Sequence, residues 1–142
     1  MVAYDLLYVE FLYHFNTTRD YFECHEVMEE LWMEEGRNPL HQGLLQVAVG
    51  LYHHRNGNIG GARKLMDQAI EKLEYYPRDS MGINLGKLVQ DARLYLEKLE
   101  RYEEEPFEFY DLNIDIVHSD LVGMVEEMKQ FPPLKHERED EG

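Results

Sequence analysis

The chain has 142 residues, 44% of them apolar and 12% aromatic. This length and composition are typical of one soluble globular domain that needs no disulfide or structural metal to fold. Its formal net charge of −15 predicts repulsion from nucleic acid and from anionic membranes, so we expect neither as a partner. Cys24 is the only cysteine, which excludes an internal disulfide. With no signal-peptide pattern at the N-terminus, this favours a cytoplasmic location.

Apolar residues recur at helical spacing through most of the chain, and turn residues separate these runs. Helices are expected over residues 3–15, 20–35, 39–56, 59–76, 84–104 and 119–130. Residues 107–113 are expected to be extended or irregular. The pattern therefore predicts an all-α fold, in which residues 1–133 form a single domain of five to six antiparallel helices. The charged residues 134–142 are expected to be a disordered acidic tail.

Several residues mark where the second and third helices begin and end. Thr17, followed three residues later by Asp20, resembles a capping box that starts the second helix. Gly36 is expected to follow its last turn, because glycine readily adopts the left-handed conformation found there. Asn38 and Pro39 are typical of a helix N-cap and first turn. The turn between these two helices is therefore short, and they should run antiparallel.

One helical hairpin has the spacing of small residues found in a tetratricopeptide repeat. Gly50, Ala62 and Ala69 keep that spacing, and Gly57-Asn58 lies where such repeats turn. Positions one period of 34 residues earlier or later do not match. The sequence therefore predicts one hairpin similar to this repeat and no repeat array.

Two ordered blocks of sequence resemble a family of small helical proteins, the domain of unknown function family 309. The family signature His-Glu-x-x-Glu-x-x-Trp is matched by His25, Glu26, Glu29 and Trp32. The second block runs from Gln42 through His53 to Ala62. The resemblance implies an all-α fold, and it implies no established activity because the family is uncharacterised.

The second helix places polar residues within its apolar stripe. At 100° per residue, Tyr21, His25, Met28, Glu29 and Trp32 share one face, and the helix's other carboxylates, Glu23 included, are expected to point outward. An inward carboxylate is costly unless it is paired. This face of the second helix is therefore the first half of a candidate site.

The third helix supplies a matching polar stripe, although it is the most apolar helix of the chain. Gln42, Gln46 and His53 share one of its faces. At a rise of ~1.5 Å per residue, Glu29 should lie opposite Gln46, and His25 should approach His53. We therefore expect these side chains to converge between the two helices, next to Trp32.

Three interpretations of this constellation stay open. It can be a buried polar network that rigidifies the core. It can be a metal site in which His25, Glu29 and His53 bind Zn²⁺ or Fe²⁺, with open positions for water and a possible metal-dependent hydrolase activity. It can also be a pocket for a small molecule or peptide, in which Glu29 and His25 could also act as acid and base without a metal. That pocket would be lined by Tyr21, His25, Glu29, Trp32, Gln42, Gln46 and His53, with Tyr52 at its wall.

Tyrosines elsewhere on the helices suggest self-association. Tyr75, Tyr76, Tyr95 and Tyr102 are candidates for an exposed aromatic patch. A homo-oligomer, or a peptide or protein partner, is therefore expected from the sequence. The sequence leaves open whether the protein is an enzyme.

Overall fold

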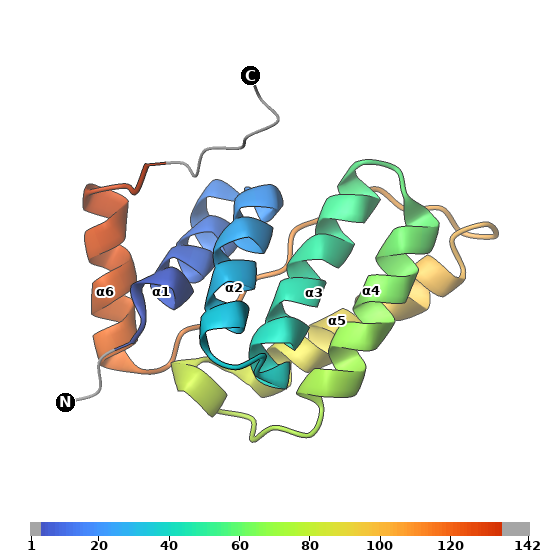
Figure 1. The fold of residues 1–142 in the computed structure, drawn as a ribbon. Helices are drawn as coiled ribbons and strands as arrows, with labels where there is room; N and C mark the ends of the chain where they lie inside the picture. The colour runs from blue at the N-terminus through green and yellow to red at the C-terminus, as the bar shows by residue number, and fades with distance from the viewer. Residues whose placement is uncertain (1–3, 135–142) are drawn as a thin grey trace.

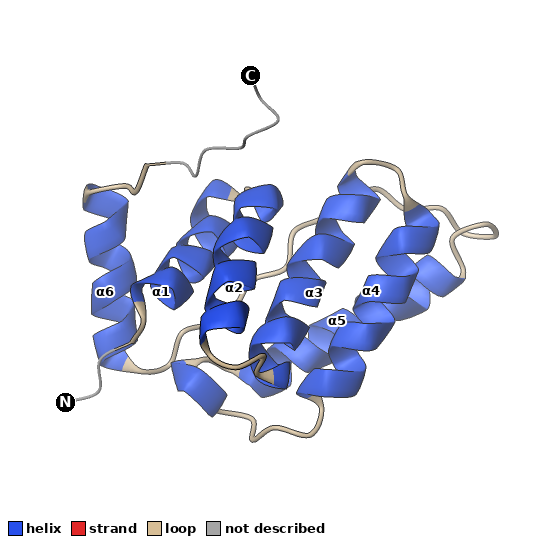
Figure 2. Cartoon of the chain, in the orientation of Figure 1, coloured by secondary structure: helices blue, strands red, loops and turns tan. Residues whose placement is uncertain are grey.

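The computed structural model describes residues 4–134, and the regular secondary structure of this part of the chain is helical (Figures 1 and 2). The α-helices are α1 (Leu6–Tyr13), α2 (Tyr21–Glu34), α3 (Pro39–Arg55), α4 (Ile59–Leu73), α5 (Leu85–Glu100) and α6 (Ser119–Gln130). Within residues 4–134 the extended backbone pairs only at one isolated bridge, between Ile83 and Ile116. The predicted all-α, single-domain fold is confirmed. The acidic tail predicted for residues 134–142 lies, apart from residue 134, outside the described residues.

From α1 to α5, each helix packs against the next helix along the chain. α1 contacts α2, α2 contacts α3, α3 contacts α4 and α4 contacts α5, while the C-terminal α6 packs against α1 (Figure 1). α3 therefore lies between α2 and α4. This position explains why α3 is apolar nearly all round, since two of its faces are covered by other helices.

The predicted boundaries around the second turn are confirmed by the capping residues. Gly36 follows α2 with a φ of +72°, and the Asn38 side chain accepts a hydrogen bond from Leu40 N at the start of α3. The N-cap of α2 is Asp20, whose side chain accepts from Glu23 N at 3.1 Å. The predicted capping role of Thr17 is therefore wrong.

The segment expected to break the first helix continues it instead. Residues His14–Thr18 form a π-helix directly after α1, and Arg19 then reverses the chain in a left-handed conformation with a φ of +58°. A π-turn holds one more residue than an α-turn, is rare, and often occurs at functional sites. The first helical run, expected to end at residue 15, therefore continues to Thr18.

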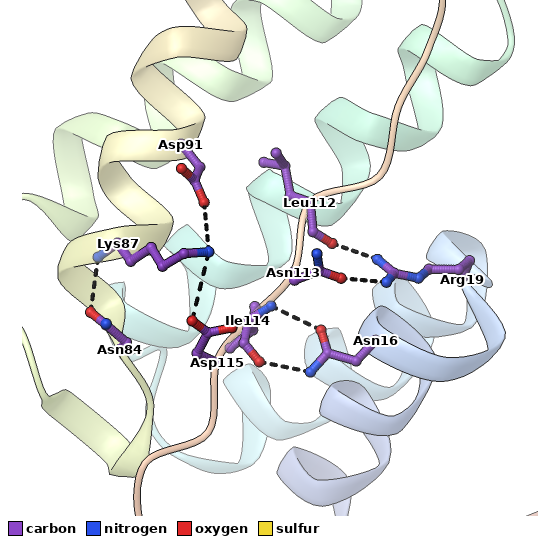
Figure 3. A network of polar contacts seen from close by, with 9 residues as sticks. All are labelled: Asn16, Arg19, Asn84, Lys87, Asp91, Leu112, Asn113, Ile114 and Asp115. Atoms are coloured by element: carbon purple, nitrogen blue, oxygen red, sulfur yellow. Dashed lines mark hydrogen bonds and ion pairs between the residues drawn. The ribbon is translucent and has the colours of Figure 1, made fainter.

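A non-helical segment of residues 106–118, here called the strap, connects α5 with α6. It crosses back over the helices and contacts the π-helix (Figure 3). Asn16 Nδ2 donates to Ile114 O at 2.7 Å, and Ile114 N donates back to Asn16 Oδ1 at 2.9 Å. Arg19 donates to Leu112 O and to the Asn113 side chain. On the other side Lys87 of α5 lies 3.7 Å from an Asp115 carboxylate oxygen.

The four tyrosines predicted to form an exposed patch do not share an environment. Tyr95 is fully buried in the core, Tyr76 and Tyr102 are half-buried, and Tyr75 is exposed. The predicted aromatic patch is therefore wrong, because α5 turns Tyr95 towards α3 and the strap. Self-association itself stays a prediction.

The close approach of α3 and α4 depends on Gly50. A Cβ atom added there would lie 3.2 Å from the Met66 side chain and 3.5 Å from the Ala62 carbonyl oxygen. The likeness of this hairpin to a tetratricopeptide repeat stays a prediction. Of the described helices, none is long and apolar enough to cross a membrane.

Candidate functional site

Two carboxylates of α2, Glu23 and Glu29, show the opposite burial from the prediction. Glu23 is completely buried, whereas Glu29 is exposed. α2 packs against α1 as well as α3, so a second face of the helix is buried and Glu23 lies on it. The prediction assumed that only the face carrying Glu29 pointed inward, and it was wrong on this point.

His25 and Glu29 lie next to each other on the half-exposed side of α2. His25 Nε2 is 3.3 Å from a Glu29 carboxylate oxygen, and Nδ1 is 3.5 Å from a carboxylate oxygen of Glu26. The exposed fractions of the His25 and Glu29 side chains are 37% and 51%. Such an ion pair is well solvated and contributes little to stability. The pair is available to a ligand instead.

A pocket of about 150 Å³ lies between α2 and α3 next to this pair. Aromatic, imidazole and aliphatic side chains line it, namely Tyr21, Phe22, His25, Val49, Tyr52 and His53. The rings of Phe22 and Tyr52 meet edge to face with their centroids 6.0 Å apart. The structure thus places three of the predicted site residues, Tyr21, His25 and His53, on one pocket.

The base of this pocket is fixed by Tyr21. Its hydroxyl donates a hydrogen bond to Asp111 of the strap, and the Arg55 guanidinium lies 4.8 Å from its ring centroid. Burial raises the pKa of Tyr21 well above its ordinary value, so the phenol keeps its proton. Tyr21 therefore lines the pocket with an uncharged ring whose position is fixed by these contacts.

Other predicted site residues lie apart from this pocket. Gln46 Nε2 donates to Gln68 Oε1 of α4 at 3.0 Å, so the Gln46 amide is directed towards α4. Gln42 is half-buried near the start of α3. Trp32 is also half-buried, with the Arg37 guanidinium 5.4 Å from the centre of its ring. The expected contact between Glu29 and Gln46 is not formed, because Glu29 pairs with His25 and Gln46 with Gln68.

A second polar cluster lies on the opposite side of α2. Glu10 of α1, His14 at the start of the π-helix and Glu23 of α2 are all buried, and one ligand atom from each lies within 4.8 Å of the other two. Within residues 4–134 this is the one set of three potential metal ligands that meets this spacing, so His25, Glu29 and His53 do not form such a set. Sequence reasoning missed it, although Glu10 and His14 have the i, i+4 spacing of neighbours on a helix.

His54 is a further buried histidine. Its Nδ1 hydrogen-bonds the Tyr95 hydroxyl, and its ring packs against Phe107 at a centroid distance of 4.7 Å. Burial lowers the pKa of His54 below its ordinary value. The strap covers this imidazole, although the ring belongs to the last turn of α3.

A larger cavity, of about 450 Å³, lies between α4 and α5 and contains none of the predicted site residues. Charged side chains stand at its walls, among them Glu74, Arg78 and Arg93. Glu74 and Arg93 pair across it at 3.6 Å. The smaller α2–α3 pocket differs from it in being bounded mainly by aromatic rings.

Two known proteins are similar to this chain over part of its length. Over 102 residues, 68% of this chain, it is 39% identical to the uncharacterized protein YpuF of Bacillus subtilis (strain 168) and covers 59% of it. It is 31% identical over 85 residues, 58% of the chain, to an uncharacterized protein of Aquifex aeolicus (strain VF5) and covers 24% of that protein. The chain thus spans less than two thirds of the length of either relative.

The family match falls on the helices that form both polar clusters. Residues 8–65 match the family described as domain of unknown function (DUF309). This range includes α2, α3, the π-helix and most of α1. The resemblance drawn from the His25 motif is thereby confirmed, and residues 8–65 of this chain belong to the domain of unknown function family 309.

Proposed function

We propose that the protein is a binding module that holds one apolar side chain of a partner peptide in the α2–α3 pocket. The observation that carries the proposal is the size and lining of the pocket, about 150 Å³ bounded mainly by aromatic and imidazole rings. A cavity of ~150 Å³ accommodates a group of about the size of benzene. The pocket therefore suits one aromatic or leucine-sized side chain rather than a whole cofactor.

The charges near the pocket favour a basic partner. Glu26 and Glu29 flank His25 at its edge, and the protein as a whole carries a net charge of −15. Electrostatic complementarity speeds association and selects partners. A segment with lysine or arginine next to an aromatic residue would place the ring in the pocket and its cations near these carboxylates.

The proposal can be tested with two short peptides, Lys-Lys-Phe-Lys-Lys and the same sequence with alanine in place of phenylalanine. NMR titration of the full chain should give saturable shifts at the amides of Phe22, Tyr52 and His53. Burying one large apolar side chain contributes about 1.5–3 kcal/mol, so the phenylalanine peptide should bind about ten- to a hundredfold more tightly. Equal affinity of the two peptides would show charge attraction alone and would contradict the proposal.

A matched pair of variants locates the binding site. Val49→Trp should fill the pocket with a side chain from its own wall and weaken binding of the phenylalanine peptide. Leu94→Trp places the same side chain at an exposed position of α5 and should leave binding unchanged. Thermal unfolding of both variants controls for loss of the fold.

A further inference from the structure

Glu10, His14 and Glu23 bring two carboxylates and an imidazole together in the interior. Glu23 is 0% exposed, His14 4% and Glu10 8%, and the three belong to α2, the π-helix and α1 respectively. Buried carboxylates persist in proteins when they are paired with cations or coordinate metals. The cluster is separate from the α2–α3 pocket, because Glu23 lies on the face of α2 that packs on α1 and His25 on the other.

Thr18 determines which nitrogen of His14 carries a proton. The Thr18 hydroxyl donates to the His14 carbonyl oxygen at 3.3 Å, and its oxygen accepts from Asp20 N at 3.2 Å. A hydroxyl has a single proton to donate; with that proton on the His14 carbonyl oxygen, the 2.9 Å contact of the same hydroxyl oxygen with His14 is made by the Nδ1–H. In the neutral ring, Nε2 then carries the lone pair.

The Nε2 atom of His14 points into the cluster. It is buried without a hydrogen-bond partner among the described residues, and a Glu10 carboxylate oxygen lies 3.4 Å away. A positive charge between these two electron-rich atoms, carried by a proton or by a metal ion, would make their contact favourable. In a tetrahedral site with bonds of ~2.0–2.2 Å, neighbouring ligand atoms are about 3.3–3.6 Å apart, a range that includes the 3.4 Å between His14 Nε2 and the Glu10 oxygen.

We propose that Glu10, His14 and Glu23 bind a divalent transition-metal ion of the Zn²⁺ class. Two carboxylates and a neutral imidazole balance the charge of such an ion, which removes the electrostatic cost of the buried carboxylates. An imidazole ligand favours zinc or iron over magnesium or calcium. A protein-bound histidine ligand usually donates its other N–H to a fixed acceptor, and Thr18 provides that acceptor.

The proposal also gives the π-helix a role. His14 is its first residue and Thr18 its last, so the wider turn holds both the ligand and the group that orients it. The proposed ion would join α1 to α2 across the turn at Arg19. This inference does not depend on the α2–α3 pocket, because none of the three ligands lines it.

Calorimetric titration of Zn²⁺ into tag-free, chelator-treated full-length protein tests the site. We expect one ion per chain, with affinity at least about tenfold lower in Glu23→Gln and in His14→Gln. Thr18→Val keeps all three ligands and removes only the orienting acceptor, and should cost about 10–100-fold in affinity. His25→Gln is the matched control, since His25 and Glu29 have the same i, i+4 pairing on the exposed side of α2, and its affinity should equal that of the wild type.

Three results would overturn the proposal. Folded wild-type protein that binds no Zn²⁺ would show that the cluster is not a metal site. Equal binding by the wild type and by the Glu23→Gln and His14→Gln variants would place the ion elsewhere, as would a loss confined to His25→Gln. If the cluster variants do not fold, Mn²⁺ is instead added to isotope-labelled wild-type protein to locate the bound ion by NMR. Its NMR line broadening should centre on the amides of residues 10, 14 and 23, and broadening spread over the acidic surface would refute the site.

Discussion

His54 is a histidine held uncharged by its surroundings. The rings of Tyr95, Tyr102, Phe107 and Phe109 surround it at centroid distances of 4.7–5.9 Å. Burial lowers the pKa of His54 below its ordinary value of 6.5, and burial does the same for His41. Below pH 6.5 the unfolded chain therefore binds more protons than the folded chain does, and the free energy of unfolding falls as the pH falls.

The first prediction is that the protein is less stable at pH 5.5 than at pH 7.5. The urea midpoint of unfolding, followed by circular dichroism, measures the difference. His54→Gln removes one of the two groups responsible, so the midpoint of this variant should change less between the two pH values than that of the wild type. An equal change in both proteins would show that His54 does not contribute.

The second prediction concerns Cys24, the single thiol. It is fully buried, its Sγ lies 3.7 Å from the Phe11 carbonyl oxygen, and burial raises the pKa of the thiol. Because the thiolate is the reactive form, native protein should react with Ellman's reagent far more slowly than protein in urea. Rapid reaction of the native protein would show that α1 and α2 separate readily.

At the scale of elements, the strap is held by side chains of the π-helix. Asn16 uses both ends of its amide on the backbone of Ile114, so one side chain replaces the strand partner that this extended backbone lacks. Ile114 itself is buried. The attachment therefore satisfies backbone groups that would otherwise lose their hydrogen bonds on burial.

The third prediction is that Asn16→Ala lowers the free energy of unfolding by about 1–3 kcal/mol, because it leaves buried backbone groups of Ile114 unsatisfied. Urea unfolding of both proteins measures the change. Asn113→Ala is the matched control, since Asn113 is exposed and contacts the same segment through Arg19. A loss in the control as large as that in Asn16→Ala would argue against backbone satisfaction as the cause.

The regular elements could be predicted from local signals, and the exceptions have a physical reason. Asn38, Gly36 and the helical spacing of apolar residues act within a few positions of each other, so the positions of all six helices were predicted. The π-helix and the strap depend on contacts between residues such as Asn16 and Ile114, which are 98 positions apart. No local pattern reports such contacts.

In the candidate sites, too, some features follow from local sequence signals and others depend on contacts between distant elements. Tyr21, His25 and His53 were expected together and line one pocket, because a short turn makes α2 and α3 antiparallel. The burial of Glu23 could not be predicted from α2 alone, because it depends on how α1 packs on that helix. The Glu10–His14–Glu23 cluster could be recognised only from the relative positions of α1, the π-helix and α2.

At the scale of the whole molecule, the segment matched by the family is not a complete core. Residues 8–65 end within α4, whereas α5 contributes the buried Leu88 and Tyr95, and α6 contributes Leu121 and Val125. Without α5 and α6, apolar faces of α4 and α1 would be exposed to water. Their exposure would cost about 25 cal/mol for each Å² of apolar surface.

The fourth prediction is that a fragment ending at Tyr76 does not reach the native state. Its NMR spectrum should show poor dispersion, and its thermal unfolding should lack a cooperative transition, in contrast to the full chain. A well-dispersed spectrum would show that α1 to α4 form an independent core. The full chain, purified in the same way, is the control.

The pairing of Asn16 with Ile114 also has a consequence for synthesis on the ribosome. The two residues are 98 positions apart, and translation proceeds at about 5–20 residues per second. The first helix therefore waits roughly 5–20 s after its own synthesis for the strap that fastens its end, and longer for α6. During that interval α1 and the π-helix lack the partners that cover them in the folded domain, although they are made before those partners.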